Sequence, residues 1–255
     1  MKIRVLGCHG SQLPHFNTTS FLIEDNILVD AGTVTTVLTL KEQLCIDYIF
    51  ITHAHLDHVR DIVFLADNLY YAKRKKPLTV VSSRGIIGNL RRHLFNNVIW
   101  PDFTKIPTAA APMLKFQAVT PGRKTRFGDF QVRALKLEHT VESLGFLIET
   151  EKKAVLFLGD TGPTEEVWKT AASVTGLKAI FVETSLPAGM QESADKTGHL
   201  TPITLAAELK KMNGIKPDIY IHHMKPQHAR TIRREIISLR DKKIHIVKDA
   251  QIIRL

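Results

Sequence analysis

Thr52-His53-Ala54-His55-Leu56-Asp57-His58 is the stretch of sequence that decides the fold. It follows residues 48–51, Tyr-Ile-Phe-Ile, an apolar run that predicts a buried strand. Alternation along an extended chain sends His53 and His55 to the same side, whereas Asp57 and His58 come after the turn. The pattern therefore predicts two adjacent metal ions, one held by His53 and His55 and the other by Asp57 and His58. Imidazoles and carboxylates suit zinc, manganese or iron.

The length and composition indicate a globular protein with a sizeable core. The chain has 255 residues, of which 44% are hydrophobic, and this fits one large domain or two small ones. We find no linker, tandem repeat or low-complexity block, so we expect a single domain over residues 1–255. No apolar run approaches the ~20 residues that a membrane-spanning helix needs, and the first residues lack a signal-peptide pattern. We therefore expect a cytoplasmic protein with no membrane partner.

The formal net charge of +10 favours an anionic partner. A phosphorylated metabolite, a nucleotide and a nucleic acid all fit, and net charge does not choose among them. Cys8 and Cys45 lack the spacing of a zinc finger, and we expect no disulfide in a reducing compartment. The oligomeric state is not decided by these features, and a homodimer is left open.

Strands and helices follow one another along the chain, with a hairpin near the start. The expected strands cover residues 2–6, 20–23, 26–30, 48–51, 78–81, 114–119, 130–137, 145–150, 153–158, 179–182, 218–221, 244–247 and 251–254. The expected helices cover residues 34–44, 59–73, 84–94, 163–172, 201–212 and 228–239. Residues 96–112 contain three prolines and are expected to be irregular. This order predicts an α/β (α+β) fold in which two mixed sheets pack between helices, a four-layer αββα sandwich.

Further ligand-type residues come one or two positions after three other apolar strands. His139 follows residues 130–137, Asp160 follows residues 155–158, and an adjacent pair, His222 and His223, follows residues 219–221. Because a carboxylate has two oxygens, Asp160 can bridge two ions. The pattern alone does not decide whether His222 or His223 is the ligand.

Taken together, these motifs resemble those of the metallo-β-lactamase superfamily. The motif of residues 53–58, Asp30-Ala31-Gly32, the isolated His139, Gly159-Asp160 and the late His223 occur in order across nearly the whole chain. The resemblance implies an αββα fold and a two-metal hydrolase. It places His53, His55 and His139 on one metal, Asp57, His58 and His223 on the other, and Asp160 between them.

Narrower features resemble the class II cyclic-nucleotide phosphodiesterases. These are residues 15–23, Glu183-Thr184-Ser185-Leu186-Pro187, Gly198-His199-Leu200-Thr201-Pro202 and His223-Met224-Lys225-Pro226. In ribonuclease Z, a related branch, a similar Gly-His segment precedes a final His-containing motif at a comparable separation, which gives His223 the ligand position. His222 departs from these families, which more often carry Thr or a similar small residue there.

The resemblance implies hydrolysis of 3′,5′-cyclic nucleotides, cAMP or cGMP, to 5′-nucleotides. Two divalent ions, zinc first and manganese or iron as alternatives, activate a bridging hydroxide for in-line attack on phosphorus. Asp57, His199 and Glu183 are the expected catalytic residues. His199 gives a proton to the leaving 3′ oxygen and Glu183 orients His199, although His199 also suits the entry to a helix.

The expected substrate contacts are Asn17, Thr18, Thr19 and Lys225, each with a structural alternative. The first three form a pocket wall or a plain turn, and Lys225 contacts phosphate or faces solvent. The expected substrate is a small anionic phosphodiester, the cyclic nucleotide. The alternative substrate is an RNA, which a ribonuclease Z-like endonuclease would process. A non-catalytic nucleic-acid-binding protein and another hydrolase of the same fold are further alternatives, because a fold does not determine its substrate.

Overall fold

The computed structural model describes residues 1–212 and 214–255, whose strands form two seven-stranded sheets. The first sheet has the order β14-β1-β2-β3-β4-β5-β6, and its strands are β1 (Lys2–Gly7), β2 (Ser20–Ile23), β3 (Ile27–Val29), β4 (Tyr48–Phe50), β5 (Leu78–Ser82), β6 (Leu114–Ala118) and β14 (Ile252–Arg254). The second has the order β13-β12-β11-β10-β9-β8-β7, and its strands are β7 (Lys124–Phe127), β8 (Phe130–Leu137), β9 (Ser143–Glu149), β10 (Ala154–Leu158), β11 (Leu177–Glu183), β12 (Asp218–His222) and β13 (Ile244–Ile246).

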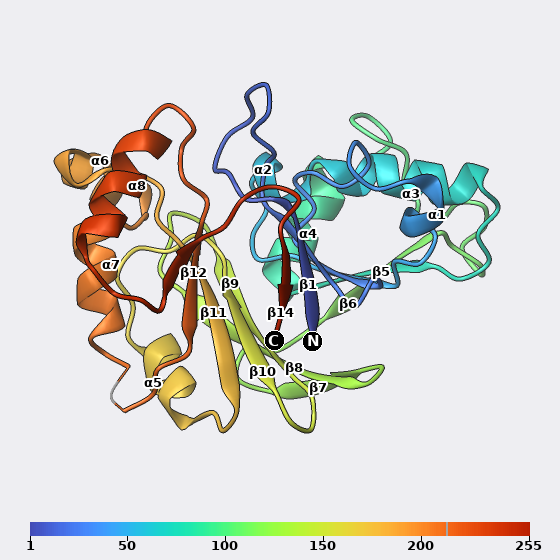
Figure 1. Cartoon of the computed structure of the whole chain (residues 1–255). Helices are drawn as coiled ribbons and strands as arrows, with labels where there is room; N and C mark the ends of the chain where they lie inside the picture. Colours follow the sequence, from blue (N-terminus) through green and yellow to red (C-terminus); the bar gives the residue numbers. More distant parts are fainter. Residues whose placement is uncertain (213) are drawn as a thin grey trace.

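Helices cover the outer faces of both sheets (Figure 1). They are α1 (Leu40–Gln43), α2 (Leu56–Val59), α3 (Asp61–Tyr71), α4 (Arg84–His93), α5 (Glu166–Ser173), the 3₁₀ turn η1 (Ala188–Met190), α6 (Gln191–Thr197), α7 (Pro202–Leu209) and α8 (Ala229–Ser238). Helices α1, α3 and α4 lie on the side of the first sheet, and α5 to α8 on the side of the second. The predicted four-layer αββα architecture is confirmed.

The side chains of the strands in the second sheet point alternately to its two faces, and apolar side chains on both faces explain why the sheet is buried on both. Phe157 of β10 and Phe181 of β11 point toward the first sheet, where they stack on each other and meet Phe21. Their neighbours Leu156 and Ile180 point the other way, into a second cluster that includes Trp168 and Ile232 of the covering helices. Successive side chains in a strand face opposite sides, so apolar residues at every position require a layer on each face.

The predicted elements differ from the structure mainly at their ends and at polar segments. The predicted helix 34–44 shrinks to α1, because the Asp61 carboxylate accepts hydrogen bonds from the backbone N–H groups of Val34 and Thr35 and holds them outside a helix. Helix α1 begins only after Thr39, whose side chain forms a capping box with Glu42. Residues 59–73 contain the end of α2 and all of α3 rather than one helix.

Two polar elements were missed by the sequence prediction. Strand β7 has the sequence KTRF and lies at an edge, where pairing with β8 determines its structure more than its own apolar pattern does. Helix α6, with the sequence QESADKT, has no apolar stripe. Residues 96–112 contain no helix or long strand, as expected. In the part of the chain that the structure describes, none of the helices combines the length and the apolar character needed to cross a bilayer.

Candidate metal centre

Strands of both sheets end at a shared edge, and the ligand-type residues follow these ends. In the first sheet, β3 and β4 are parallel, so Asp30 and His53 emerge at the same edge. In the second sheet, β10, β11 and β12 are parallel and β8 runs in the same direction, since both β8 and β10 are antiparallel to β9. The carboxyl ends of these strands therefore bring His139, Asp160, Glu183 and His223 together.

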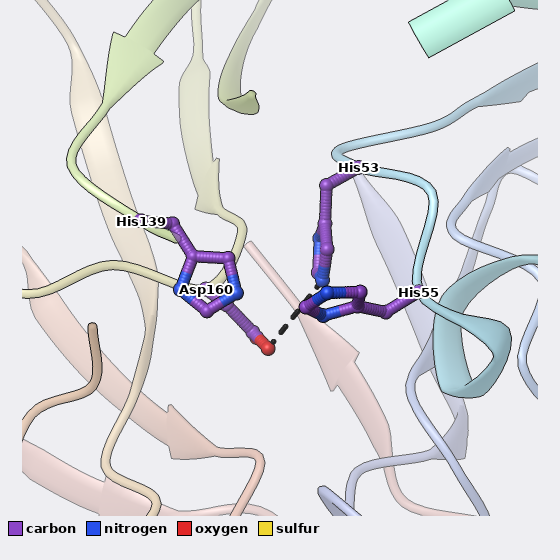
Figure 2. A group of neighbouring side chains, drawn as sticks. All are labelled: His53, His55, His139 and Asp160. Carbon is purple, nitrogen blue, oxygen red and sulfur yellow. Dashed lines mark ion pairs between the residues drawn. The ribbon is translucent and has the colours of Figure 1, made fainter. Parts of the chain in front are cut away.

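The first group of side chains consists of His53, His55, His139 and Asp160. Figure 2 shows them pointing toward one another, with His53 and His55 on one loop and with His139 and Asp160 reaching in from the second sheet. Their ligand atoms all lie within 4.8 Å of one another. The buried Nε2 atoms of His53 and His139 have no hydrogen-bond partner. Buried polar atoms normally have partners, so these nitrogens fit a metal ion at their centre.

The second group consists of Asp57, His58 and His223. The Nε2 atoms of His58 and His223 are 3.0 Å apart, and the Nε2 atom of His223 is 3.2 Å from Asp57 Oδ2. Ligands at the ordinary zinc distances of 2.0–2.1 Å in a tetrahedron stand about 3.3 Å from one another. The spacing of these atoms therefore matches the edges of a metal-coordination shell.

Hydrogen bonds to the opposite ring nitrogens determine which nitrogens are free. His58 donates from Nδ1 to Asp30 Oδ2 at 2.7 Å, and His223 donates from Nδ1 to Ser185 Oγ at 2.9 Å. Each Nε2 therefore carries a lone pair, and two lone pairs that face each other at 3.0 Å attract only if a cation lies between them. His139 Nδ1 likewise donates to the Gly198 carbonyl at 2.8 Å. Such partners orient metal-binding imidazoles.

Asp160 lies between the two groups. Its Oδ2 is 3.5 Å from His53 Nε2, whereas its Oδ1 is 3.5 Å from His58 Nε2 and 3.4 Å from His223 Nε2. Burial alone would raise the pKa of Asp160, but the imidazoles, His223 foremost, hold it well below its usual value. The side chain is therefore a carboxylate with one oxygen toward each group, as bridging requires.

The pKa values of the histidines show where a cation is favoured. Burial lowers the pKa of His53, His55 and His139, which keeps these imidazoles neutral. Burial would also lower the pKa of His58, but the carboxylates of Asp160 and Asp30 outweigh it and raise this pKa well above its usual value. The carboxylates around His58 therefore favour a positive charge there, and a divalent ion supplies one while leaving the imidazole neutral.

His199 and Glu183 form a buried pair beside both groups. His199 Nδ1 donates to Glu183 Oε1 at 2.8 Å, and Glu183 also accepts from the Ser185 hydroxyl at 2.6 Å. A ligand-type atom of His199 lies within 4.8 Å of Asp160 and His223. Burial would lower the pKa of His199, and Glu183 overcomes this effect and raises it. Glu183 therefore favours the protonated form of His199 next to the centre.

The match with a known family covers most of the chain. Residues 15–233 match the family described as cAMP phosphodiesterases class-II. The chain belongs to the class-II cAMP phosphodiesterase family. This result confirms the resemblance seen in the sequence motifs.

The individual relatives of this class-II family member align with part of this chain and with part of their own length. A probable 3′,5′-cyclic-nucleotide phosphodiesterase from Yersinia pestis is 30% identical over 217 residues, which are 74% of this chain and 60% of the relative. The 3′,5′-cyclic-nucleotide phosphodiesterase 1 of Saccharomyces cerevisiae is 29% identical over 191 residues, 66% of this chain and 50% of the relative. The matched chain thus spans between half and three fifths of these relatives. Ribonuclease Z of Haloarcula marismortui is 23% identical over 160 residues, 60% of this chain and 49% of that protein.

Solved structures establish the fold of this family member. Unliganded yeast PDE1 aligns with a TM-score of 0.85 over 100% of this chain and 99% of that chain, at 21% identity. The metallo-β-lactamase fold protein YhfI from Bacillus subtilis aligns with a TM-score of 0.77 over 99% of this chain and 98% of that chain, at 17% identity. The metallo-β-lactamase fold predicted from the motifs is confirmed.

The adjacent histidines of the class-II motif have opposite surroundings. His222 points into the core, where its ring centroid lies 5.2 Å from that of Phe21 in a T-shaped arrangement, whereas His223 points at Asp57 and His58. Burial lowers the pKa of His222 to about 3. His223 also adopts the left-handed backbone region, with φ at 61°. The rings of His222 and His223 thus lie on opposite sides of the chain.

We expect His223→Ala to lose one bound metal ion per chain, whereas His222→Ala keeps the wild-type metal content. The reason is that only the ring of His223 reaches the ligand group. Metal content by inductively coupled plasma mass spectrometry, after dialysis against excess zinc, measures the difference, and circular dichroism checks that both variants are folded. Equal metal content in two folded variants would contradict this assignment.

The four predicted substrate residues of the phosphodiesterase motifs lie in two places. Asn17 donates from its side-chain amide to the Leu6 carbonyl at 3.2 Å, Thr18 pairs with the Thr33 hydroxyl at 3.0 Å, and Thr19 is buried. These contacts fix the loop that precedes β2. Contact of Asn17, Thr18 and Thr19 with a substrate stays a prediction. Lys225 differs, because its ammonium donates to the Gly10 carbonyl at 2.5 Å and its charge acts to lower the pKa of His199.

Asp30 is a contributor whose role we did not predict from the class-II sequence motifs. Besides its bond with His58, it accepts from the Thr52 hydroxyl at 2.9 Å, and that hydroxyl accepts from His53 Nδ1 at 3.0 Å. Asp30 therefore orients one histidine of each group. A Cβ atom on Gly32 would lie 1.9 Å from the Asp57 carbonyl oxygen, so only glycine lets this segment pack against the metal loop. The signal that could have found Asp30 is its position directly after an apolar strand.

Proposed function

We propose that the chain hydrolyses 3′,5′-cyclic nucleotides, cAMP or cGMP, to 5′-nucleotides with two divalent metal ions. The observation that carries this proposal is the convergence of two groups of ligand-type side chains on both sides of Asp160, in a member of the class-II phosphodiesterase family. The formal net charge of +10 fits an anionic substrate.

The proposed ligands form two sets that share a carboxylate. His53, His55 and His139 would hold one ion, and Asp57, His58 and His223 would hold the other. Asp160 would contribute one carboxylate oxygen to each set. The mixed nitrogen and carboxylate donors favour zinc first, with manganese or iron as alternatives. When bound, the two ions supply Lewis acidity, which lowers the pKa of a coordinated water and offsets the charge of a phosphodiester.

The side chains around the ions orient the substrate and move one proton. His199 donates a proton from Nε2 to the leaving 3′ oxygen, because Glu183 holds its Nδ1. Glu183 is a positioning residue, fixed by its bonds to the Ser185 hydroxyl and to the backbone N–H groups of Thr161 and Leu200. Asp57 keeps its negative charge, because burial would raise its pKa but the neighbouring imidazoles of His223 and His58 outweigh burial and lower it.

Lys225 is the proposed contact for a phosphoryl oxygen. One of its three ammonium protons bonds the Gly10 carbonyl, which leaves donors for a phosphate. Its backbone N–H donates to the Ser185 carbonyl at 3.1 Å, so it is attached to the segment that orients His223 and Glu183. A cytoplasmic location and a homodimer stay predictions.

The proposal is tested by turnover of cAMP and cGMP. We expect protein loaded with Zn²⁺ or Mn²⁺ to release 5′-nucleotides, detected by liquid chromatography. Dialysis against a chelator should abolish turnover, and adding the metal back should restore it. His53→Ala serves as the background control. Turnover no higher than that of this variant, with both metals and both nucleotides, would overturn the proposal.

An RNA-processing endonuclease is the second candidate, and the ribonuclease Z relatives and the net charge favour it. Incubation with a precursor tRNA separates the two, because this candidate predicts specific cleavage of the precursor and no release of 5′-nucleotides from cyclic substrates. A non-catalytic nucleic-acid-binding protein would instead bind both RNAs and DNAs with a steep salt dependence and without metal.

A further inference from the structure

A cavity of about 320 Å³ opens beside the metal centre. Its walls come from three segments: the loop that carries the metal motif, one face of α4, and the loop that follows His139. His55 lines this cavity and also belongs to the first ligand group. The cavity therefore adjoins the ligand group at His55.

The cavity combines apolar walls with a few polar groups, as small-molecule sites commonly do. Leu56 is 67% exposed and Val141 is 40% exposed, and both line it together with the buried Leu90. When a flat ring covers apolar side chains that are otherwise exposed to water, the free energy of the system is lowered. The exposure of Leu56 and Val141 is explained if a ligand packs between them.

Asn89 and His93 supply the polar groups. They lie four residues apart on α4, so they share one face of this helix, and both line the cavity. The Asn89 amide offers a donor and an acceptor, a pair that matches the adjacent N6 and N7 atoms of adenine. A purine between the apolar walls is therefore both covered and recognised at its edge.

We propose that this cavity binds the base of the nucleotide whose phosphate lies at the metal centre. This inference rests on the proposed cyclic-nucleotide hydrolysis and names its specificity pocket. Leu56 and Val141 cover the faces of the base, and Asn89 reads its edge. The larger cavity near Met1, of about 680 Å³, is lined by none of the ligand-group residues, so it offers no path to the centre.

Two variants block or weaken the pocket from opposite walls. Asn89→Trp fills it from α4, and Val141→Asn removes an apolar wall from the facing loop. Gly88→Trp is the matched control, because it adds the same ring to the same helix. A Cβ atom at Gly88 meets nothing within 4 Å, and Gly88 lines a different cavity with Arg84, Arg91 and Phe116.

The measurement is isothermal titration calorimetry of the zinc-loaded protein with 5′-AMP and with inorganic phosphate. A stacked base adds about tenfold to 100-fold in affinity, so wild-type protein should bind 5′-AMP at least tenfold more tightly than phosphate. Asn89→Trp and Val141→Asn should lose most of this advantage and keep the affinity for phosphate. Gly88→Trp should behave as wild type does.

The outcomes separate the pocket from the proposed function. Wild-type binding of 5′-AMP no tighter than that of phosphate, or unchanged 5′-AMP affinity in both folded pocket variants, would overturn the pocket even if cAMP is hydrolysed. Hydrolysis of cAMP and cGMP by the wild type decides the proposed function by itself. Circular dichroism confirms that each variant is folded.

Discussion

Asp160→Asn is expected to lower the kcat for cAMP by at least about 1,000-fold and to leave fewer than two metal ions per chain. Asp160 presents one oxygen to each ligand group, at 3.4–3.5 Å from the nearest Nε2 atoms. An amide replaces one of these oxygens by an N–H donor and removes the negative charge. In the proposed two-metal centre, the substitution would remove the bridge between the ions and the negative charge that offsets their mutual repulsion. Steady-state kinetics and metal analysis of the same preparation measure both effects.

Asp129→Asn is the matched control for this substitution. Asp129 is exposed in the turn between β7 and β8, so it should keep the wild-type kcat and metal content. An Asp160→Asn protein that binds two ions and retains more than a tenth of the wild-type kcat would exclude the bridging role.

His199→Ala is expected to lower the kcat for cAMP by about 100-fold to 10,000-fold, the usual contribution of a general acid. The loss should depend on the leaving group. A 3′ alkoxide needs a proton as it departs, whereas 4-nitrophenolate is stable without one. With bis(4-nitrophenyl) phosphate we therefore expect the same variant to lose less than tenfold. Parallel kinetics on the two substrates give this ratio directly.

Glu183→Gln should also lower the kcat for cAMP more than that for bis(4-nitrophenyl) phosphate, but both losses should be smaller than in His199→Ala. The reason is that this substitution weakens the orientation of His199 and leaves the imidazole in place. His245→Ala is the control, since His245 contacts Asp218 and Tyr220 on β12 and not the metal centre. Equal losses on both substrates in His199→Ala would show that His199 supports the structure of the site rather than protonating the leaving group.

The sequence predicted the grouping of the candidate ligands because four of them come soon after the end of an apolar strand. His53, His139, Asp160 and His223 all come within three residues of a strand end, and parallel strands within one sheet bring such ends to one edge. The four layers were predicted from the order of strands and helices along the chain, and the apolar residues at every position of β10 fit this prediction because both faces of the strand are covered.

The supporting contacts could not be predicted, because they depend on neighbours that are distant in the sequence. Asp30 meets His58, 28 residues away, and Ser185 meets His223, 38 residues away. No local pattern indicates these pairs. Short polar elements such as β7 were missed for the same reason, since their pairing with a neighbour and not their own composition determines their structure.

Anomalous X-ray diffraction from crystals of the zinc-loaded protein tests the central claim most directly, because it locates the ions without reference to activity. We predict two zinc peaks on either side of the Asp160 carboxylate, one among His53, His55 and His139, and the other among Asp57, His58 and His223. A single peak, or peaks away from these side chains, would contradict the two-metal centre and the chemistry built on it.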